Sequence, residues 1–197
     1  MAAFASYINE IKERFKESAK IKNDIAKDDE QLLVLNSIAN MIIRAYKNDN
    51  KILIFGNGGS AADAQHIAAE LVSKFKMNRK GLQAIALTTN TSVITAIGND
   101  FTFDQIFDRQ VEAFAKRGDV VIGISTSGES NNVILGLMKA DKMGCYTIAF
   151  TGKKDNRISM FSVLTFNVPS KDTARIQEAH ITAGHIICEI VERELFS

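Results

Sequence analysis

Apolar positions recur at helical spacing near the start of the chain. Within residues 28–47 they repeat every three or four residues and charged residues occupy the other side; the apolar positions are Leu32, Leu33, Leu35, Ile38, Ile42 and Ile43. Side chains at this spacing share one face of an α-helix. The pattern predicts two helices in this region, over residues 4–21 and 28–47.

The pattern changes at residue 51, where short β-branched and apolar runs begin to alternate with helical segments. The runs predicted as strands are 52–55, 84–87, 120–124, 146–150 and 163–168. The segments predicted as helices are 59–75, about 91–97, 104–115, 130–142 and 172–195. Strands that are apolar throughout are buried on both faces, as in a parallel sheet covered by helices. We therefore expect an α/β fold, a flavodoxin-like doubly wound sheet of five parallel strands, with two N-terminal helices and a long C-terminal helix.

No part of the sequence marks a boundary between domains. The chain has one proline, Pro169, no low-complexity stretch, and a length of 197 residues that suits one domain. We expect a single domain over residues 1–197, with the helical pair in 1–48 and the α/β core in 49–197.

Composition and charge narrow the class of function. Lys and Arg total 24 and Asp and Glu total 23, so nothing indicates binding to nucleic acid or to an anionic membrane. No apolar run approaches the roughly 20 residues of a membrane span, and charges interrupt the N-terminal segment, unlike in a signal peptide. Cys145 and Cys188 lie in separate apolar runs, as buried thiols do in a reducing compartment. We expect a soluble cytoplasmic protein.

Two loops rich in small and polar residues follow the first and third predicted strands. They read GNGGS at 56–60 and STSGES at 125–130. In a flavodoxin-like sheet these two strands flank the point where the strand order reverses, and ligands bind there beyond the carboxyl ends of the strands. We therefore expect the two loops to face each other across one crevice.

The chemistry of these loops favours a single phosphate monoester as ligand. Neither contains Lys or Arg, which polyphosphate sites usually recruit, whereas hydroxyl groups and helix N-termini hold one phosphate. The first loop matches G-x-G-x-x-A, but no acidic residue follows the second strand to bind a ribose, and no P-loop Lys follows. Each loop alone also fits a simple helix cap. The hydroxyl groups belong to Ser60, Ser125, Thr126, Ser127 and Ser130.

A second group of polar residues lies on the helices next to these loops. His66 and Glu70 are four residues apart on one helix face, and Gln177 and His185 share a broad face of the C-terminal helix. Two histidines, a carboxylate and an amide oxygen suit a four-ligand zinc site. Alternatively, the Glu and a His serve as base and acid in a proton transfer. His180 points away from His185 and is expected in the core.

Taken together, these motifs resemble those of the phosphoheptose isomerases, SIS-domain proteins that convert sedoheptulose 7-phosphate to D-glycero-D-manno-heptose 7-phosphate. The resemblance covers nearly the whole chain. It rests on GNGGSAADAQH (56–66), HIAAE (66–70), IGND (97–100), GDVVIGISTSGES (118–130) and RIQEAH (175–180) followed by His185. Two positions depart from the family pattern: Lys74 stands where many relatives have Arg, and Ala174 where some have Asp.

The resemblance implies an assembly, a cofactor and a set of site residues. It implies a homotetramer with active sites between subunits, one Zn²⁺ per subunit, and catalytic roles for Glu70 and His185. The implied zinc ligands are His66, Glu70, Gln177 and His185. The implied substrate contacts are Asn57, Gly58, Gly59, Glu70, Asn99, Asp100, Ser125, Thr126, Ser127, Ser130 and Gln177, and Ser60 is expected beside them.

The implied reaction is an aldose–ketose isomerisation through an enediol, the first step toward nucleotide-activated heptose for surface glycans such as lipopolysaccharide or capsule. Two other functions compete with it. One is a non-catalytic SIS-domain adaptor for a protein partner such as the replication initiator, and the other is a domain that senses a sugar phosphate. Adaptors of this type lack the Glu of HIAAE and the closing His, whereas this chain keeps Glu70 and His185. No DNA-binding or transport segment accompanies the domain, which disfavours the sensor.

Overall fold

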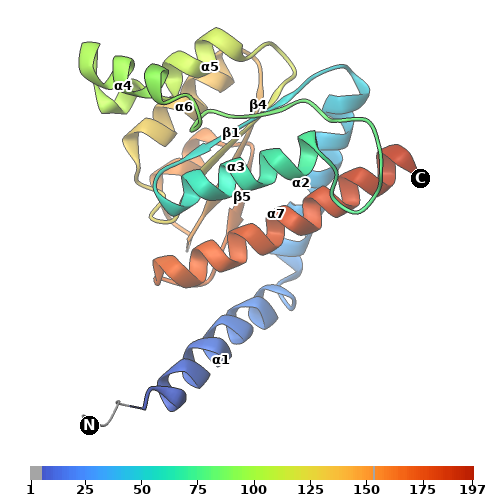
Figure 1. Cartoon of the computed structure of the whole chain (residues 1–197), viewed down its shortest axis with the longest axis vertical. Helices are drawn as coiled ribbons and strands as arrows, with labels where there is room; N and C mark the ends of the chain where they lie inside the picture. The colour runs from blue at the N-terminus through green and yellow to red at the C-terminus, as the bar shows by residue number, and fades with distance from the viewer. Residues whose placement is uncertain (1–5, 153) are drawn as a thin grey trace, which may run out of the picture.

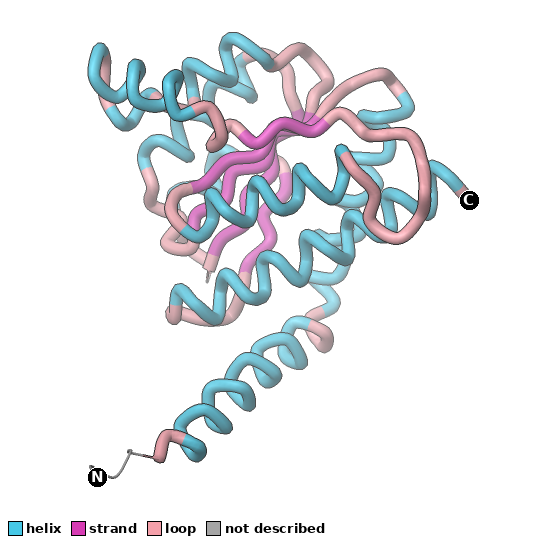
Figure 2. The backbone as a smooth tube through the Cα atoms, viewed as in Figure 1, coloured by secondary structure: helices cyan, strands magenta, loops and turns pink. Residues whose placement is uncertain are grey.

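The computed structural model describes residues 6–152 and 154–197. Within these residues, five strands form one parallel sheet in the order β2–β1–β3–β4–β5 (Figure 2). The strands are β1 Ile52–Gly56, β2 Ala84–Ala86, β3 Val120–Ser125, β4 Tyr146–Thr151 and β5 Leu164–Asn167. This is the flavodoxin-like order predicted from the sequence, and every strand end lies within one residue of its predicted position.

The sheet separates two apolar cores because successive side chains of a strand point to opposite faces. In β1, Ile52 and Ile54 pack on one side and Leu53 and Phe55 on the other, all of them fully buried. The first core is covered by α2, α3 and α7, and the second by α5 and α6 (Figure 1). These helices are α2 Asp29–Lys47, α3 Gly59–Val72, α5 Asp108–Phe114, α6 Asn131–Lys142 and α7 Thr173–Phe196.

Two helices precede the sheet, as predicted, and the first of them, α1 (Ile8–Ile25), projects from the body of the molecule (Figure 1). The predicted C-terminal end of this helix at residue 21 was wrong. The helix continues to Ile25, and both Ile21 and Ile25 are buried against the core. Residues 4 and 5 of the predicted helix lie outside the described residues. No described helix combines the length and apolarity needed to cross a membrane.

Three of the later helices differ from their predicted bounds by more than one residue, and α6 and α7 differ by one residue. The predicted helix 104–115 is interrupted: a 3-10 turn, η1 (Phe103–Gln105), precedes α5, because Ile106 and Phe107 turn inward and are buried. The helix α4 (Thr91–Asp100) runs three residues beyond its predicted end, and α3 stops three residues before its own. A second 3-10 turn, η2 (Arg157–Phe161), was not predicted.

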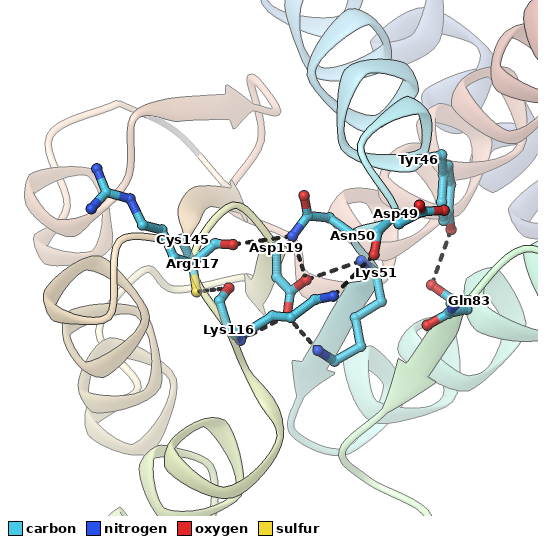
Figure 3. A network of polar contacts seen from close by, with 9 residues as sticks. All are labelled: Tyr46, Asp49, Asn50, Lys51, Gln83, Lys116, Arg117, Asp119 and Cys145. Atoms are coloured by element: carbon cyan, nitrogen blue, oxygen red, sulfur yellow. Dashed lines mark hydrogen bonds and ion pairs between the residues drawn. The ribbon is translucent and has the colours of Figure 1, made fainter.

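The amino-terminal edge of the sheet is held by the buried carboxylate of Asp119 (Figure 3). It accepts hydrogen bonds from the backbone N–H and the ammonium group of Lys51, from the backbone N–H of Lys116 and from the amide of Asn50. These donors outweigh the effect of burial, which by itself raises the pKa of Asp119, and they lower that pKa below its ordinary value. Asp119 therefore ties the start of β1 to the start of β3.

Candidate active site

The loops that follow β1 and β3 meet at the carboxyl-terminal edge of the sheet. The amide of Asn57 donates to the side-chain oxygen of Asn132 at 2.9 Å, and the amide of Asn132 donates back to Asn57 at 2.8 Å. Because β1 and β3 are neighbouring parallel strands, both loops leave the sheet at the same edge. The crevice between residues 56–60 and 125–130 predicted from the sequence is therefore present.

The first loop turns sharply into α3. Gly58 has φ +54°, in the left-handed region that favours glycine, and it precedes the first residue of the helix. The next residue, Gly59, leaves room for the side chain of Gln177, since a Cβ at this position would lie 2.5 Å from Gln177 Nε2. Ser60 is buried directly behind the turn. The turn thus brings the beginning of α3 against the beginning of α7.

The second loop gathers serine hydroxyl groups. Ser125 Oγ lies 3.0 Å from Ser130 Oγ and 3.4 Å from Ser127 Oγ, and it accepts the backbone N–H of Gly128 at 3.2 Å. Thr126 lies between them, and its carbonyl accepts the N–H of Gly152. Hydroxyl groups in this arrangement are able to donate to the oxygens of one anionic group.

The two helices that begin at these loops differ from α2, α4 and α7 at their N-termini. Asp28, Asn90 and Asp172 cap those three helices by accepting first-turn N–H groups. In the described part of the chain, no side chain of the preceding residue caps α3 or α6. A helix N-terminus carries partial positive charge, so both helices direct this charge toward the crevice.

Two to three turns further along α3, this helix and α7 bring two histidines and a glutamate together. His66 Nε2 lies 3.1 Å from Glu70 Oε1 and 3.1 Å from His185 Nε2, and the three ligand atoms lie within 4.8 Å of one another. His66 and Glu70 meet because they are one turn apart on α3. His185 reaches them because α7 runs parallel to α3, as the contacts of Gly59 with Gln177 and of Ile67 with Gly184 indicate.

This cluster has the donor set and spacing of a metal site. One imidazole nitrogen cannot donate a proton to Glu70 and also accept one from His185, so hydrogen bonds alone do not satisfy both contacts of His66 Nε2. Binding of a cation needs no proton on any of the three ligand atoms, so it removes this conflict. In a tetrahedral zinc site with bonds near 2.0–2.2 Å, ligand atoms lie about 3.3 Å apart, close to the two observed separations.

Two neighbouring groups affect the electrostatics of this cluster. Burial raises the pKa of Asp63, one turn before His66, against a lowering influence of His66 itself. Burial, with the nearby charge of Glu70, raises the pKa of the Cys188 thiol to about 12. Cys188 is therefore a neutral thiol at pH 7, and it is not one of the three residues whose ligand atoms cluster.

The remaining predicted site residues lie at different places in the chain. Gln177 lies against Gly59, about two turns before the level of His185 on α7. Asn99 and Asp100 are exposed at the end of α4, where Asn99 Nδ2 donates to Asp100 Oδ1 at 2.8 Å. Among the described residues, no hydrogen bond joins these two to the crevice loops.

His180 lies in the core, as the sequence indicated. It is fully buried beside Phe150 and Phe166, and its Nε2 lies 3.0 Å from the carbonyl oxygen of Thr151. Burial lowers the pKa of His180 to about 4. It is therefore neutral at pH 7 and stays separate from the cluster of His66 and His185.

Sequence reasoning missed four residues that shape this region: Asn132, Phe75, Arg79 and Glu192. Asn132 pairs with Asn57, and the other three connect the end of α3 to α7. One feature of the sequence pointed to Glu192. It is a charged residue two turns after His185, on the side of the helix that carries the buried Cys188 and Val191. Nothing in the local pattern singled out Arg79, which lies in the polar segment SKFKMNRKG.

Comparison with known proteins gives consistent results over nearly the full chain. A sequence profile described as SIS domain matches residues 6–152. The phosphoheptose isomerase of Clostridium acetobutylicum is 54% identical over 188 residues, which are 95% of this chain and 96% of that protein. The phosphoheptose isomerase of Aquifex aeolicus is 55% identical and covers 94% of this chain and 96% of its own length.

Solved structures agree with these sequence relatives. The structure of a phosphoheptose isomerase from Neisseria gonorrhoeae superposes with a TM-score of 0.89 at 40% identity, covering 95% of this chain and all of its own. A phosphoheptose isomerase from Francisella tularensis superposes with a TM-score of 0.91 at 32% identity, covering 96% of this chain. The expected sheet topology and the two leading helices are thus shared with experimentally determined structures.

Proposed function

Because this chain belongs to the phosphoheptose isomerases, a family of SIS-domain proteins, we propose that it converts sedoheptulose 7-phosphate to D-glycero-D-manno-heptose 7-phosphate. The observation that carries this proposal is the convergence of Glu70 and His185 within 4.8 Å of each other between α3, which begins at the first polar loop, and α7. A site for a phosphate and a pair of proton-transferring groups are the two parts that such a reaction needs.

The reaction moves a carbonyl group from carbon 2 of a ketose to carbon 1. One group removes a proton from carbon 1 to form an enediol, a proton moves between the two oxygens, and a proton is returned to carbon 2. We assign the proton transfers at oxygen to Glu70 and the transfer at carbon to His185, each while its side chain is not a ligand of the metal ion. Both side chains face the same space between α3 and α7, so both reach one substrate.

The polar loops bind the phosphate at the far end of the sugar. Ser60 belongs to the first loop, the hydroxyl groups of Ser125, Thr126, Ser127 and Ser130 belong to the second, and Asn57, Gly58 and Gly59 line the turn. The N-termini of α3 and α6 add partial positive charge without a Lys or Arg, which suits a monoester. Binding the phosphate at a distance from the reacting carbons uses remote binding energy to orient them.

One Zn²⁺ per subunit fits the cluster of His66, Glu70 and His185. Gln177, the proposed fourth ligand, lies eight residues before His185, about 12 Å along α7, so one chain by itself does not bring it to this cluster. The three imidazole and carboxylate donors are supported by their mutual distances, whereas Gln177 is proposed from the family resemblance. When bound, the ion acts as a Lewis acid that polarises the sugar carbonyl. The zinc content of the purified protein, measured by elemental analysis, tests this assignment.

We further propose a homotetramer whose active sites lie between subunits. The support is the exposed apolar row on α1, where Ile8 is 72% and Phe15 75% exposed and Ile11 lies between them. A projecting helix with such a row is stabilised by packing against another subunit. We propose that Asn99 and Asp100, which lie exposed at the end of α4, contact the substrate in that assembly, and that residues 1–197 act as a single domain.

The reaction also suggests a cellular setting. We propose that the protein works in the cytoplasm, where its two buried thiols remain reduced. The product supplies heptose for lipopolysaccharide or capsule. The adaptor alternative has no support beyond the shared fold.

Incubation with sedoheptulose 7-phosphate in deuterated water, followed by NMR, tests the activity. We expect an aldose signal that grows with time and carries deuterium at carbon 2, and partial retention of proton would indicate a base shielded from solvent. Zinc is supplied and the oligomeric state is checked beforehand. Absence of conversion by the folded, zinc-loaded protein would reject the isomerase in favour of the adaptor.

A further inference from the structure

The C-terminal end of α3 is capped by the side chain of a buried arginine rather than by a glycine. Arg79 Nη2 donates to the carbonyl of Glu70 at 2.8 Å, and Nη1 donates to the carbonyls of Leu71 at 2.6 Å and Ser73 at 3.1 Å. The last carbonyls of a helix have no partner within it, and a cation at this end is favourable. Arg79 therefore holds the backbone of the last turn of α3, which carries Glu70.

The arginine is held in turn by Glu192 on α7. Glu192 Oε1 accepts Arg79 Nε at 2.9 Å, and both side chains are only 2% exposed. The same carboxylate accepts the backbone N–H groups of Phe75, Lys76 and Met77 at 2.7–3.0 Å. Although burial by itself raises the pKa of Glu192, these donors together lower it, so the carboxylate is charged at pH 7.

The segment bound by Glu192 also contacts His185. The ring of Phe75 stacks on the His185 imidazole with 5.6 Å between ring centroids and 28° between ring planes. Since Glu192 accepts the backbone N–H of Phe75, the position of this ring depends on the carboxylate. Residues 73–83 run beside the C-terminal half of α7 in both views (Figures 1 and 2).

We propose that Arg79 and Glu192 are positioning residues that hold the side chains of Glu70 and His185 in the relative positions that the isomerisation requires. This inference rests on the proposed function and deepens it. Arg79 acts on Glu70 through the backbone of α3, and Glu192 acts on His185 through Phe75. The guanidinium of Arg79 and the carboxylate of Glu192 make no hydrogen bond to the side chains of the described cluster of His66, Glu70 and His185.

A requirement for exact placement explains why the protein buries this ion pair. Taking two charges out of water is costly, and buried pairs are replaced by apolar residues in other proteins without loss of stability. Catalytic groups, in contrast, have to be held to within about 0.5 Å, and a network of directional hydrogen bonds provides this precision. The hydrogen bonds of the Arg79–Glu192 pair end on the segments that carry Glu70 and Phe75.

The Lys51–Asp119 pair provides a matched control for the test. Its carboxylate is also fully buried and also accepts backbone N–H groups, and its donors come from residues around the starts of β1 and β3 rather than from α3 and α7 (Figure 3). Glu192→Gln and Asp119→Asn each replace a buried carboxylate by an amide of the same shape. Arg79→Lys is a milder third variant, which keeps the positive charge but removes the planar guanidinium and its fixed set of N–H donors.

The experiment compares these variants in steady-state kinetics and in NMR spectra of histidine rings labelled with ¹³C. We expect Glu192→Gln and Arg79→Lys to lower kcat at least tenfold with KM changed less than twofold, because the phosphate loops are untouched. Asp119→Asn should lower the melting temperature and leave kcat unchanged. The chain has three histidines, and the signal of His185 should move in Glu192→Gln while that of His180 stays in place.

Two results would overturn the proposal. One is a Glu192→Gln variant that loses stability as Asp119→Asn does but keeps kcat, and the other is a His185 signal identical to that of the parent. The ring signal is observed whether or not the protein turns over this substrate. If the parent shows no isomerase activity, the proposed function fails, and the positioning role is decided by the His185 signal alone.

Discussion

At the scale of single residues, His66 is the centre of the site because its Nε2 atom contacts both Glu70 and His185 at 3.1 Å. His66 is half exposed, Glu70 less so, and neither is sequestered from a substrate. The same three side chains offer metal ligands and proton-transferring groups. Substitutions that preserve size and remove one function at a time separate these roles.

The substitution Glu70→Gln tests the carboxylate. The amide has nearly the same volume but neither accepts a proton nor carries charge, so turnover should fall by at least about a hundredfold, the usual contribution of a general acid or base. Binding of inorganic phosphate, measured by calorimetry, should change little because the loops lie apart from Glu70. Turnover close to that of the parent would contradict the catalytic assignment, and zinc content is measured in parallel.

At the scale of secondary structure elements, the site depends on the close contact between α3 and α7. Gly184 lies against Ile67, and a Cβ at Gly184 would approach Ile67 Cδ1 to 2.8 Å and Cγ1 to 2.9 Å. Both residues are buried at the level of His66 and His185. The absence of a side chain at Gly184 therefore sets the spacing at which the two imidazoles meet.

The substitution Gly184→Ala should force these helices apart. We expect a loss of about 1–3 kcal/mol in the free energy of unfolding, as for other overpacked cores, together with reduced activity. Chemical denaturation and the isomerase assay measure the two effects. In the Ile67→Ala background, which removes both contacted atoms, the same substitution should cost less. An equal cost in both backgrounds would mean that crowding against Ile67 is not the cause.

At the scale of the whole molecule, the two edges of the sheet differ in their roles. The carboxyl-terminal edge carries the polar loops, and the amino-terminal edge is fastened by Asp119 and its donors (Figure 3). The projecting helix α1 is a third feature at this scale, since its exposed apolar row has no cover within the described chain. Changes at Asp119 should affect stability, and changes on the apolar row of α1 should affect assembly.

The pKa of Asp119 predicts how stability depends on pH. Because its folded pKa lies below the unfolded value of about 3.9, Asp119 stabilises the protein fully above that value. The contribution is lost as pH falls through the lowered folded pKa. The difference in unfolding free energy between the parent and Asp119→Asn should therefore be largest near neutral pH, about 1–3 kcal/mol, and should shrink below about pH 4. A difference independent of pH would contradict this.

The apolar row on α1 predicts the effect of a polar substitution on assembly. Phe15→Ser should dissociate the proposed tetramer into smaller species, because it removes a large exposed side chain from the surface that another subunit covers. Molar mass measured by light scattering during gel filtration gives the result. Lys16→Ser, at the adjacent charged position, is the control and should keep the parental mass. A Phe15→Ser variant with the mass of the parent would remove α1 from the interface.

Local patterns along the chain were sufficient to predict the fold and half of the site. The continuous apolar runs of β1 and β3 predicted buried parallel strands, and the polar loops after them indicated the crevice. The spacing of His66 and Glu70 was sufficient to place them together, since the helical repeat alone decides which side chains share a turn. Local periodicity carries this information because it depends only on the geometry of one element.

The tertiary structure decided what depends on packing between elements. The meeting of His185 with His66 requires α7 to lie parallel to α3 at the distance that Gly184 allows. The early end of α3 follows from Arg79 and Glu192, which are 113 residues apart in the sequence. The Asn57–Asn132 pair likewise joins loops that no local pattern connects. Spacing along the chain specifies neighbours within an element, whereas contacts between elements depend on how side-chain volumes fit, and only the packed structure contains that fit.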